Sequence, residues 1–395
     1  MKSLLLLGCT GSIGTQTLEL VRSSPEHFRI AALCASSSWE LLAEQVHEFR
    51  PDVVALRDRE AAARLRDVID GSVAILSGEE ASAQLASEAD YHTAVHGIVG
   101  AAGLPASIAV LERGKTLALA NKESLVVAGA LLMELARTGG GTIVPVDSEH
   151  AAIFQCLRGE SVDSVRRVLL TASGGPLRDR PLDEFDSISP AEALDHPTWD
   201  MGPRISLGSA TLMNKALEVI EAHHLYGLEA ERIEVVLHRQ SIVHSMVEFR
   251  DGSVLAQMGP PDMRGPIHHA LHYPDRAPCK LVGFDLACFS SLSFEPVDPR
   301  RFPALELGYE CVRAGGDAGC ALNAADEVAC QAFLDGRISF QDIVPVGRSV
   351  LAARPGLEGD LASLLESDRI SRGLAEREVA RRERTPVRDS SSPCP

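Results

Sequence analysis

The sequence lacks the features that define several large classes of protein. Its nine cysteines include no Cys-x-x-Cys pair, and their odd number fits neither a disulfide framework nor a zinc site, which favours a reducing compartment. The apolar run at 4–7 is too short for a signal peptide. The longest uncharged window, 91–111, is broken by histidine, glycine and proline, so no membrane span is expected.

Positive charge is also scarce. The chain has 38 basic and 55 acidic residues, a net charge of −17, and such a charge repels the phosphate backbone of nucleic acids. We therefore expect a cytoplasmic protein that binds neither nucleic acid nor membrane. A local site for a small anion stays possible, because nearby donors and not the net charge decide such binding.

The 395 residues are numerous enough for two or three folded domains. Short apolar strands such as 4–7 and 30–34 alternate with helical stretches such as 39–49, which is typical of a parallel α/β sheet. Later strands, among them 241–249 and 253–258, are joined as a hairpin. We predict an α/β protein with a Rossmann-like NADP-binding domain over 1–147, a central α+β catalytic domain over 148–273, a linker over 274–303, and a helical C-terminal domain over 304–395.

A glycine-rich turn, 8–14 (GCTGSIG), lies between the first strand and the first helix. Glycines let a dinucleotide's pyrophosphate approach the backbone, and a helix N-terminus supplies free N–H groups. A tight turn without a ligand remains the alternative. The second strand ends in a run of serines, including Ser36 and Ser37, where NAD sites place an acid, and this favours NADP over NAD.

Two carboxylates, Asp147 and Glu149, stand where a strand ends and a helix starts. Side chains alternate along a strand with a period of two, so Asp147 and Glu149 can point the same way. Two such carboxylates require a cation or a proton between them, and oxygen ligands suit Mg²⁺ or Mn²⁺. The alternative is an ordinary helix cap.

A third carboxylate, Glu218, shares a predicted helix face with Asn214 and Lys215. The face could belong to a metal site or form a surface ion pair. With Ser209 before this helix and Ser173 in another turn, it could also bind a phosphate. The segment 196–202 contains Trp199, and we interpret it either as a lid that excludes water or as a loop anchored to the core.

The motifs together resemble 1-deoxy-D-xylulose-5-phosphate reductoisomerases, and they occur in that family's order. The resemblance implies the family's three-domain fold, NADPH and Mg²⁺ or Mn²⁺ as cofactors, a sugar phosphate substrate and a homodimer. The segments that carry it are 8–14, 120–124 (ANKES), 145–150 (PVDSEH), 170–176 (LTASGGP), 196–202 (HPTWDMG), 209–218 (SATLMNKALE), 240–246 (QSIVHSM), 252–264 (GSVLAQMGPPDMR) and 323–328 (NAADEV).

The resemblance also implies roles for individual residues. The metal ligands would be Asp147, Glu149 and Glu218, and catalysis would further involve Lys122 and His150. Substrate contacts would come from Lys122, Ser148, Glu149, Ser173, His196, Trp199, Ser209, Asn214, Lys215 and Glu218. NADPH would contact Thr10, Gly11, Ser12, Ile13, Ser36, Ser37, Asn121, Glu123 and Gly202.

The implied reaction is the isomerisation and reduction of 1-deoxy-D-xylulose 5-phosphate to 2-C-methyl-D-erythritol 4-phosphate, an isoprenoid precursor. Two other functions are weighed against it. One is a simple NADP-linked dehydrogenase without isomerisation, which needs no site of three carboxylates. The other is a silent NADP-binding sensor, for which broken metal ligands would be expected. The sequence also departs from the family's pattern, for example with Arg204 in place of a usual lysine and Asp326 in place of a usual asparagine.

Overall fold

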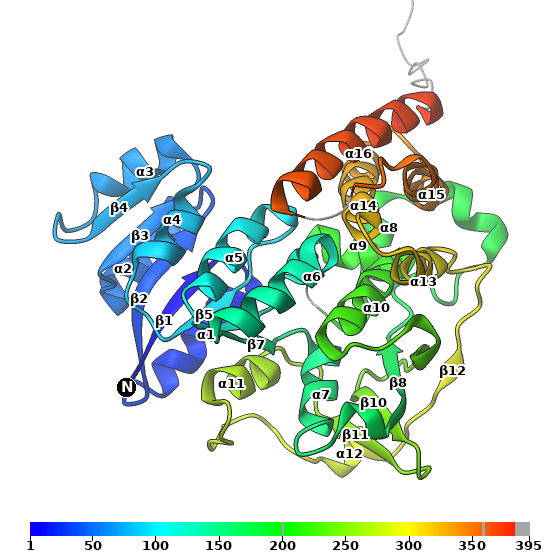
Figure 1. The fold of residues 1–395 in the computed structure, drawn as a ribbon, viewed down its shortest axis with the longest axis horizontal. Coiled ribbons are helices and arrows are strands. Elements are labelled where there is room, and N and C mark those ends of the chain that lie inside the picture. Colours follow the sequence, from blue (N-terminus) through cyan, green and yellow to red (C-terminus); the bar gives the residue numbers. More distant parts are fainter. Residues whose placement is uncertain (200, 358–359, 384–395) are drawn as a thin grey trace, which may run out of the picture.

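The structure, a computed structural model, describes residues 1–199, 201–357 and 360–383. Its N-terminal part is a seven-stranded parallel sheet in the order β4-β3-β2-β1-β5-β6-β7, drawn in blue and cyan in Figure 1. This doubly wound arrangement confirms the predicted Rossmann-like domain. Its strands are β1 (Lys2–Leu7), β2 (Phe28–Ala35), β3 (Val53–Leu56), β4 (Ala74–Ser77), β5 (Thr93–His96), β6 (Thr116–Leu119) and β7 (Thr142–Pro145).

Helices cover both faces of this sheet, because nearly every residue of its central strands is apolar and buried on both sides. One face packs against α1 (Ser12–Ser23), α2 (Trp39–Phe49), α3 (Arg59–Arg66) and the distant α11 (Arg264–His272). The other packs against α4 (Ala81–Glu88), α5 (Leu104–Glu112) and α6 (Lys122–Gly139).

A second sheet of five strands lies beside the first, in the order β11-β10-β8-β9-β12. Its strands are β8 (Val165–Ala172), β9 (Ile233–Leu237), β10 (Val243–Phe249), β11 (Val254–Met258) and β12 (Glu295–Pro296). The helices α7 (Ser148–Cys156) and α10 (Met213–Tyr226) pack on it through residues such as Ile153 and Val219. Two shorter helices, α8 (Pro190–Leu194) and α9 (Pro203–Thr211), precede α10.

The segment 274–303 is more than the linker we predicted. It contains a short helix, α12 (Leu286–Phe289), and the strand β12, which pairs with the open edge of β9. Two backbone-paired residues at that edge leave fewer unpaired polar groups on the sheet.

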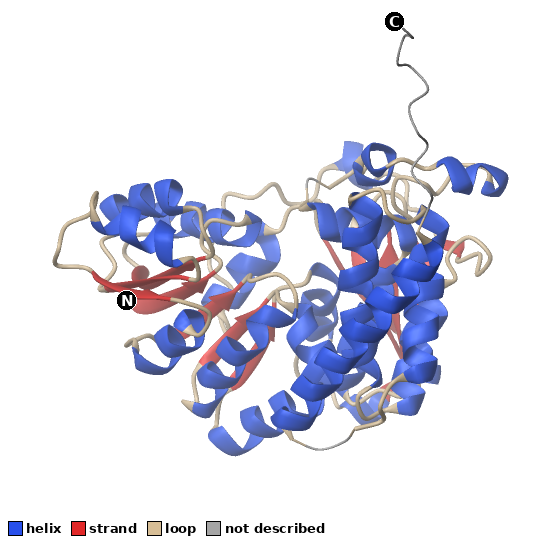
Figure 2. Ribbon diagram, turned by 90° about the horizontal axis from the view of Figure 1, so that it is seen from above, coloured by secondary structure: helices blue, strands red, loops and turns tan. Residues whose placement is uncertain are grey.

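The C-terminal part is helical, as predicted, and consists of α13 (Ala304–Ala314), α14 (Ala318–Leu334), α15 (Ile343–Ala353) and α16 (Leu361–Arg382). Residues 384–395 of the predicted helical domain lie outside the described residues. Figure 2 shows these helices massed beside the second sheet. Among the described helices, none is both long and apolar enough to span a membrane.

Candidate active site

The glycine-rich turn joins β1 to α1 with its backbone open toward solvent. Gly8 has a φ of +87°, and a Cβ there would lie 2.9 Å from the backbone of Gly97. At Gly14 a Cβ would lie 2.4 Å from the Gly8 oxygen, so close packing explains both glycines. Gly11 is different, because among the described residues its nearest contact would be Gly8 O at 3.5 Å. Packing does not require Gly11, which favours a bound phosphate over a plain tight turn.

The serines that follow β2 lie at the same edge of the sheet. Gly8 and Cys9 both donate backbone hydrogen bonds to the carbonyl of Cys34, at 2.9 and 2.8 Å, so the turn is fixed to the end of β2. Ser36 and Ser37 come directly after that strand and are exposed. Their position fits the recognition of a ribose 2′-phosphate by hydroxyl groups.

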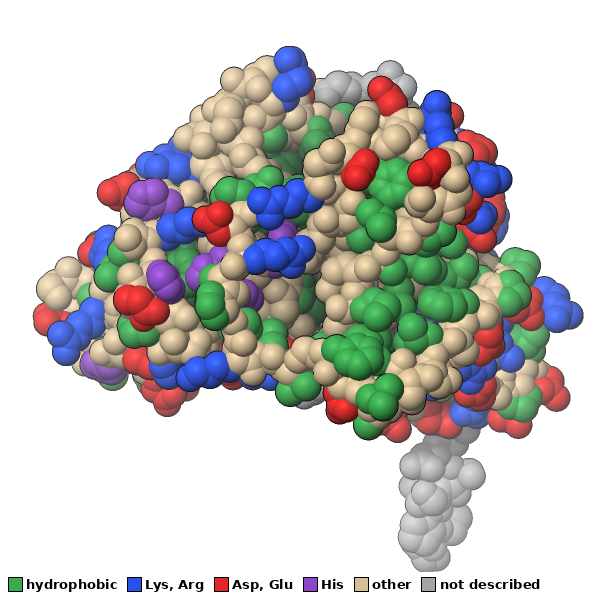
Figure 3. Space-filling view, turned by 90° about the horizontal axis from the view of Figure 1, so that it is seen from below, with side chains coloured by type: hydrophobic (Ala, Val, Ile, Leu, Met, Phe, Trp, Pro, Cys, Tyr) green, Lys and Arg blue, Asp and Glu red, His purple; other side chains and the backbone are tan. Residues whose placement is uncertain are grey.

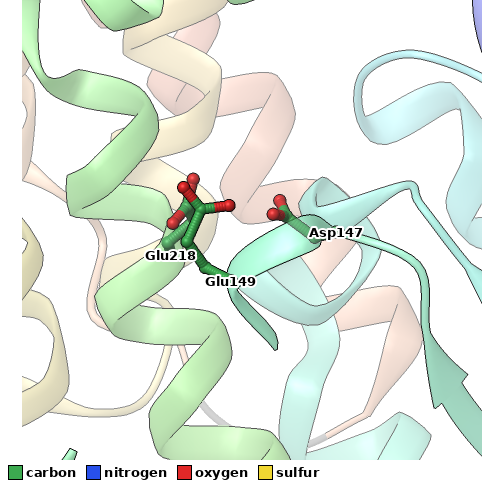
Figure 4. A group of neighbouring side chains, drawn as sticks. All are labelled: Asp147, Glu149 and Glu218. Carbon is green, nitrogen blue, oxygen red and sulfur yellow. The ribbon is translucent and has the colours of Figure 1, made fainter. Parts of the chain in front are cut away.

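The three carboxylates of Asp147, Glu149 and Glu218 come together, with ligand oxygens all within 4.8 Å of one another (Figure 4). The reason we gave for the first pair is wrong. β7 ends at Pro145, so Asp147 is the N-cap of α7 and Glu149 lies in its first turn, rather than alternating along a strand. Within the described residues the Asp147 side chain accepts no capping hydrogen bond, so the role of this carboxylate is not explained by capping α7.

Two lysines hold these carboxylates in place. The Nζ of Lys122 contacts Asp147 and lies 3.1 Å from Glu218 Oε1, whereas the Nζ of Lys215 lies 2.7 Å from Glu149 Oε1 and also contacts Glu218. Burial disfavours the charge on each lysine, but the carboxylates outweigh it and raise the pKa of both. Burial would also raise the pKa of Asp147, yet Lys122 and His150 hold it well below its usual range.

The cluster suits a divalent cation. Three carboxylates against two ammonium groups leave one negative charge in a mostly buried site, and every candidate ligand is a carboxylate oxygen. Burial and the facing carboxylate of Glu218 raise the pKa of Glu149, which shows that the two anions repel each other. Oxygen donors in such a group fit Mg²⁺ or Mn²⁺.

His150 does not line the cavity. It is fully buried behind Asp147, with its Nε2 3.2 Å from Glu221 Oε2, and its backbone oxygen accepts a hydrogen bond of 2.6 Å from the Tyr226 hydroxyl. Burial opposes a charge on His150, but Glu221 raises its pKa. His150 is therefore placed to support the carboxylates rather than to touch a substrate.

The expected phosphate site is formed by two backbone segments that meet closely. The turn after β8 has Gly175 with a φ of +67°, and a Cβ there would lie 2.5 Å from the Ser209 carbonyl oxygen. Ser173 Oγ lies 3.0 Å from His196 Nε2. Ser209, which we expected before the helix that carries Glu218, lies in a helix of its own, α9, because Leu212 has a φ of +59° and separates α9 from α10.

The predicted helix face of α10 is confirmed. Asn214 Nδ2 donates to Glu218 Oε1 at 2.6 Å, and Lys215 also contacts Glu218. Both side chains therefore join the phosphate side of the site to the carboxylate cluster.

The loop that follows His196 borders the same space. The ring of Trp199 lies 6.4 Å from that of His244, and His196 Nδ1 accepts hydrogen bonds from the backbone of residues 198 and 199. Asp200, part of the expected lid, lies outside the described residues. The lid function remains a prediction.

One cavity of about 560 Å³ brings most of the predicted residues together. It lies between the carboxyl edge of the first sheet and the second domain. From the predicted set, its lining includes Ser12, Ile13, Lys122, Asp147, Ser148, Glu149, Ser173, His196, Trp199, Gly202, Ser209, Asn214, Lys215 and Glu218.

Other predicted residues do not line this cavity. Thr10, Gly11, Ser36 and Ser37 lie at the sheet edge. Asn121 and Glu123 are buried, and the Asn121 amide donates to the carbonyl oxygens of Ile98 and Gly100.

Sequence reasoning missed some cavity residues. Ser241 is a buried residue with a φ of +53°, and its place in the segment 240–246 was the available signal. Arg264, whose Nη2 lies 2.6 Å from an Asp262 oxygen, adds a cation to the cavity lining near α1.

Comparisons with known proteins agree with this geometry. The family profile of 1-deoxy-D-xylulose 5-phosphate reductoisomerase matches residues 4–129. The profile of the same family's C-terminal domain matches residues 143–226, and a second profile, DXP reductoisomerase C-terminal domain, matches residues 258–374.

Individual relatives match nearly end to end. The 1-deoxy-D-xylulose 5-phosphate reductoisomerase of Chlorobaculum tepidum is 47% identical over 95% of this chain and 99% of its own. That of Pelotomaculum thermopropionicum is 46% identical over 95% of this chain and 97% of its own. A solved reductoisomerase with NADPH, fosmidomycin and magnesium has a TM-score of 0.92 at 40% identity, covering 96% of this chain and 98% of its own. The solved Zymomonas mobilis enzyme with NADPH has a TM-score of 0.89 at 39% identity, covering 96% of this chain and 99% of its own.

Proposed function

Because this chain belongs to the 1-deoxy-D-xylulose 5-phosphate reductoisomerase family, we propose that the residues of this one cavity carry out that family's reaction. The enzyme is an oxidoreductase that uses NADPH and a divalent metal to convert 1-deoxy-D-xylulose 5-phosphate to 2-C-methyl-D-erythritol 4-phosphate. When bound, the metal supplies Lewis-acid polarisation of substrate oxygens and NADPH supplies the hydride. The observation that carries the proposal is the carboxylate cluster on the wall of a cavity that also includes Ser12 and Ile13 of the cofactor turn.

The carboxylate side of the cavity binds and orients the reacting end of the substrate. Asp147, Glu149 and Glu218 are the proposed metal ligands. Lys122 Nζ, which lies beside Asp147 and Glu218, donates a hydrogen bond to a substrate oxygen and keeps a positive charge next to it. Ser148 adds a hydroxyl at the start of α7, and His150 supports Asp147 from behind.

The opposite side anchors the phosphate. Ser173 and Ser209 both line the cavity near the point where Gly175 approaches the backbone of α9, and His196 contacts Ser173. Asn214 and Lys215 extend this group toward Glu218. A phosphate fixed there holds one end of a flexible substrate, so that its binding energy aligns the other end with the cofactor. Trp199 covers the cavity and excludes water.

NADPH binds along the edge of the first sheet. Thr10, Gly11, Ser12 and Ile13 offer the pyrophosphate the open turn and the N-terminus of α1. The remaining proposed contacts are the serines at the 2′-phosphate, and Asn121, Glu123 and Gly202 toward the nicotinamide end.

The test is the loss of NADPH absorbance on mixing with 1-deoxy-D-xylulose 5-phosphate and Mn²⁺. We expect turnover that a chelator abolishes, and a fall of more than about 100-fold in Asp147→Asn, beyond what the loss of a metal's outer-shell partner costs. Asp179→Asn, which removes an exposed carboxylate, is the matched control. NADPH oxidation that persists with chelator would indicate a simple dehydrogenase. NADPH binding without turnover would indicate a silent sensor.

We also propose that the enzyme is a homodimer that pairs through the β11 edge of the second sheet. Among the described strands none pairs with the outer edge of β11, which exposes Val254, Leu255 and Met258. The segment that includes α12 exposes Phe284 and Leu286 by 73% and 70%. Figure 3 shows hydrophobic side chains gathered on the underside of the molecule, where β11 and α12 lie in Figure 1. Such a patch is characteristic of a protein interface.

Light scattering on the eluting protein tests this assembly. We expect a dimer for the wild type and a monomer for Leu255→Glu, because a charge on the edge strand opposes pairing. Leu365→Glu, at an exposed leucine on α16, is the control and should remain a dimer. A monomeric wild type would contradict the proposal.

We place the enzyme in the cytoplasm. The eight cysteines among the described residues are all free thiols. Five of them are buried, as expected for side chains that pack as small apolar groups in a reducing compartment.

A further inference from the structure

A network of charged side chains lies outside the cavity, at the point where three parts of the molecule meet. Its centre is Arg204, in the first turn of α9, whose side chain is only 20% exposed. Its guanidinium donates to Glu327 Oε1 at 2.6 Å and to Asn323 Oδ1 at 2.9 Å, both on α14. Arg204 therefore fixes the start of α9 to the C-terminal domain.

The same carboxylate also holds the cofactor domain. Glu327 Oε1 accepts a hydrogen bond of 3.0 Å from the backbone N–H of Ala101, in the loop after β5. That loop is closely fitted here, because a Cβ on Gly100 would lie 2.8 Å from Glu327 Oε1 and 3.1 Å from the Arg204 guanidinium. Glu123, at the start of α6, lies 3.7 Å from Arg204.

The loop after β5 reaches the glycine-rich turn. The Asn121 amide donates to the carbonyls of residues 98 and 100, and a Cβ on Gly97 would lie 3.0 Å from the side chain of Ile13. At the other end of the path, α9 carries Ser209 of the phosphate site. Packed and hydrogen-bonded groups thus connect the cofactor turn with the phosphate site through Glu327 and Arg204.

We propose that Arg204, acting through Glu327, is a positioning residue that fixes α9 relative to the cofactor loop and so couples NADPH binding to substrate binding. The inference rests on the proposed function, since it takes Ser209 as a phosphate contact and the turn at 8–14 as the cofactor site. Arg204 does not line the cavity. The backbone N–H of Ala101 and the Arg204 guanidinium both donate to Glu327 Oε1, so that a shift of either group displaces the other.

Among the described residues Arg204 is the only charged member of the network that lies on α9, while Leu207 and Ala210 of α9 pack against α14 through apolar contacts. Arg372 on α16 lies 2.6 Å from Glu327 Oε2 and holds that carboxylate when Arg204 is removed. Asp326 lies 3.5 Å from Arg204. Arg204→Met should therefore loosen the polar attachment of the start of α9 to the loop after β5, while the apolar packing of α9 and the Arg372–Glu327 pair remain.

The test measures how strongly one ligand favours the other. The dissociation constant of NADPH is measured by its fluorescence with and without fosmidomycin, the ligand in the related solved structure. The ratio of the two constants is the coupling, which by linkage is the same in either direction. Steady-state kinetics give KM and kcat for the same variants.

We expect Arg204→Met to reduce the coupling ratio by about tenfold, within the usual range for linked sites. Arg204→Lys should restore part of it, because an ammonium can pair with Glu327 but lacks the rigid fork with which the guanidinium holds Glu327 and Asn323 in a fixed geometry. Glu327→Gln should reduce the ratio as well, and the double variant should be no worse than Arg204→Met. Arg313→Met, which removes an exposed ion pair on α13, is the control and should match the wild type.

A lower melting temperature in Arg204→Met with an unchanged coupling ratio would overturn the proposal, since a merely structural role predicts that result. Additive effects of the two substitutions would overturn it too. A wild type that binds no NADPH would instead refute the proposed function, and this outcome is visible before any variant is compared.

Discussion

A single methyl group added at Gly175 should disturb the substrate site and leave the rest of the fold in place. Its φ of +67° disfavours any residue with a Cβ, at a cost of about 1 kcal/mol. The Cβ of Gly175→Ala would also lie 2.5 Å from the Ser209 carbonyl oxygen, where ordinary contact begins at 3.4 Å. All three of its nearest atoms belong to the backbone of α9, so no side chain can rotate away. The helix must move by about 1 Å.

A displacement of about 1 Å at a positioning group can cost roughly 100-fold in rate. Because Ser209 moves with α9 and the cofactor turn does not, we expect kcat/KM for 1-deoxy-D-xylulose 5-phosphate to fall 10- to 100-fold. The dissociation constant of NADPH, measured by fluorescence in the absence of substrate, should change little. Steady-state kinetics with each substrate varied in turn provide the comparison.

The control is Gly336→Ala. Gly336 has a φ of +72°, and a Cβ there would meet nothing within 4 Å among the described residues. It carries the same backbone strain without the close approach, so Gly175→Ala should lose more stability than Gly336→Ala, and only Gly175→Ala should lose activity. If the two variants kept kcat/KM within twofold of each other, the contact between the turn and α9 would not position the phosphate site, and the reasoning would fail.

Two further predictions concern protons and metal. Burial lowers the pKa of His224 to about 4, so it binds a proton more readily in the unfolded chain than in the folded one. The contribution of His224 to the free energy of unfolding is therefore fully present above about pH 6.5 and is lost toward pH 4, by up to about 3 kcal/mol. In denaturant unfolding over this pH range, His224→Phe should show a smaller fall in stability than the exposed control His27→Gln. Mn²⁺ at 100 times its dissociation constant should stabilise the wild type by about 2.7 kcal/mol. In thermal scans Mn²⁺ should not raise the melting temperature of Glu149→Gln, whereas the control Glu234→Gln should respond as the wild type does. A rise that persists in Glu149→Gln would show that Glu149 is not a metal ligand.

Much of the fold could be predicted because its signals are local. The run at 4–7 is apolar on every side, as a strand covered by helices on both faces must be. The helix 39–49 has the bounds that the sequence predicted. The shared face of Asn214, Lys215 and Glu218 also follows from helical spacing alone.

The parts that could not be predicted depend on contacts between distant segments. The sequence shows that Asp147 and Glu149 are close in the chain, but only the structure shows that the strand stops at Pro145 and that both lie at a helix start. Leu212 has a φ of +59° because α9 and α10 must turn there, and a leucine carries no signal for such a break. Arg204 and Glu327 are 123 residues apart, so no local pattern connects them.

Local sequence patterns and contacts between distant segments determine different parts of the site. Metal binding needs charges at fixed spacing on rigid helix ends, and α7 and α10 encode that spacing in a few consecutive residues. Placing the phosphate against the cofactor requires two domains to meet at a defined distance, and that distance depends on glycines and shared carboxylates whose partners are far away in sequence. Substitutions in the first group should therefore abolish metal-dependent chemistry outright. Substitutions in the second, such as Gly175→Ala and Arg204→Met, should leave each ligand able to bind and weaken only their alignment.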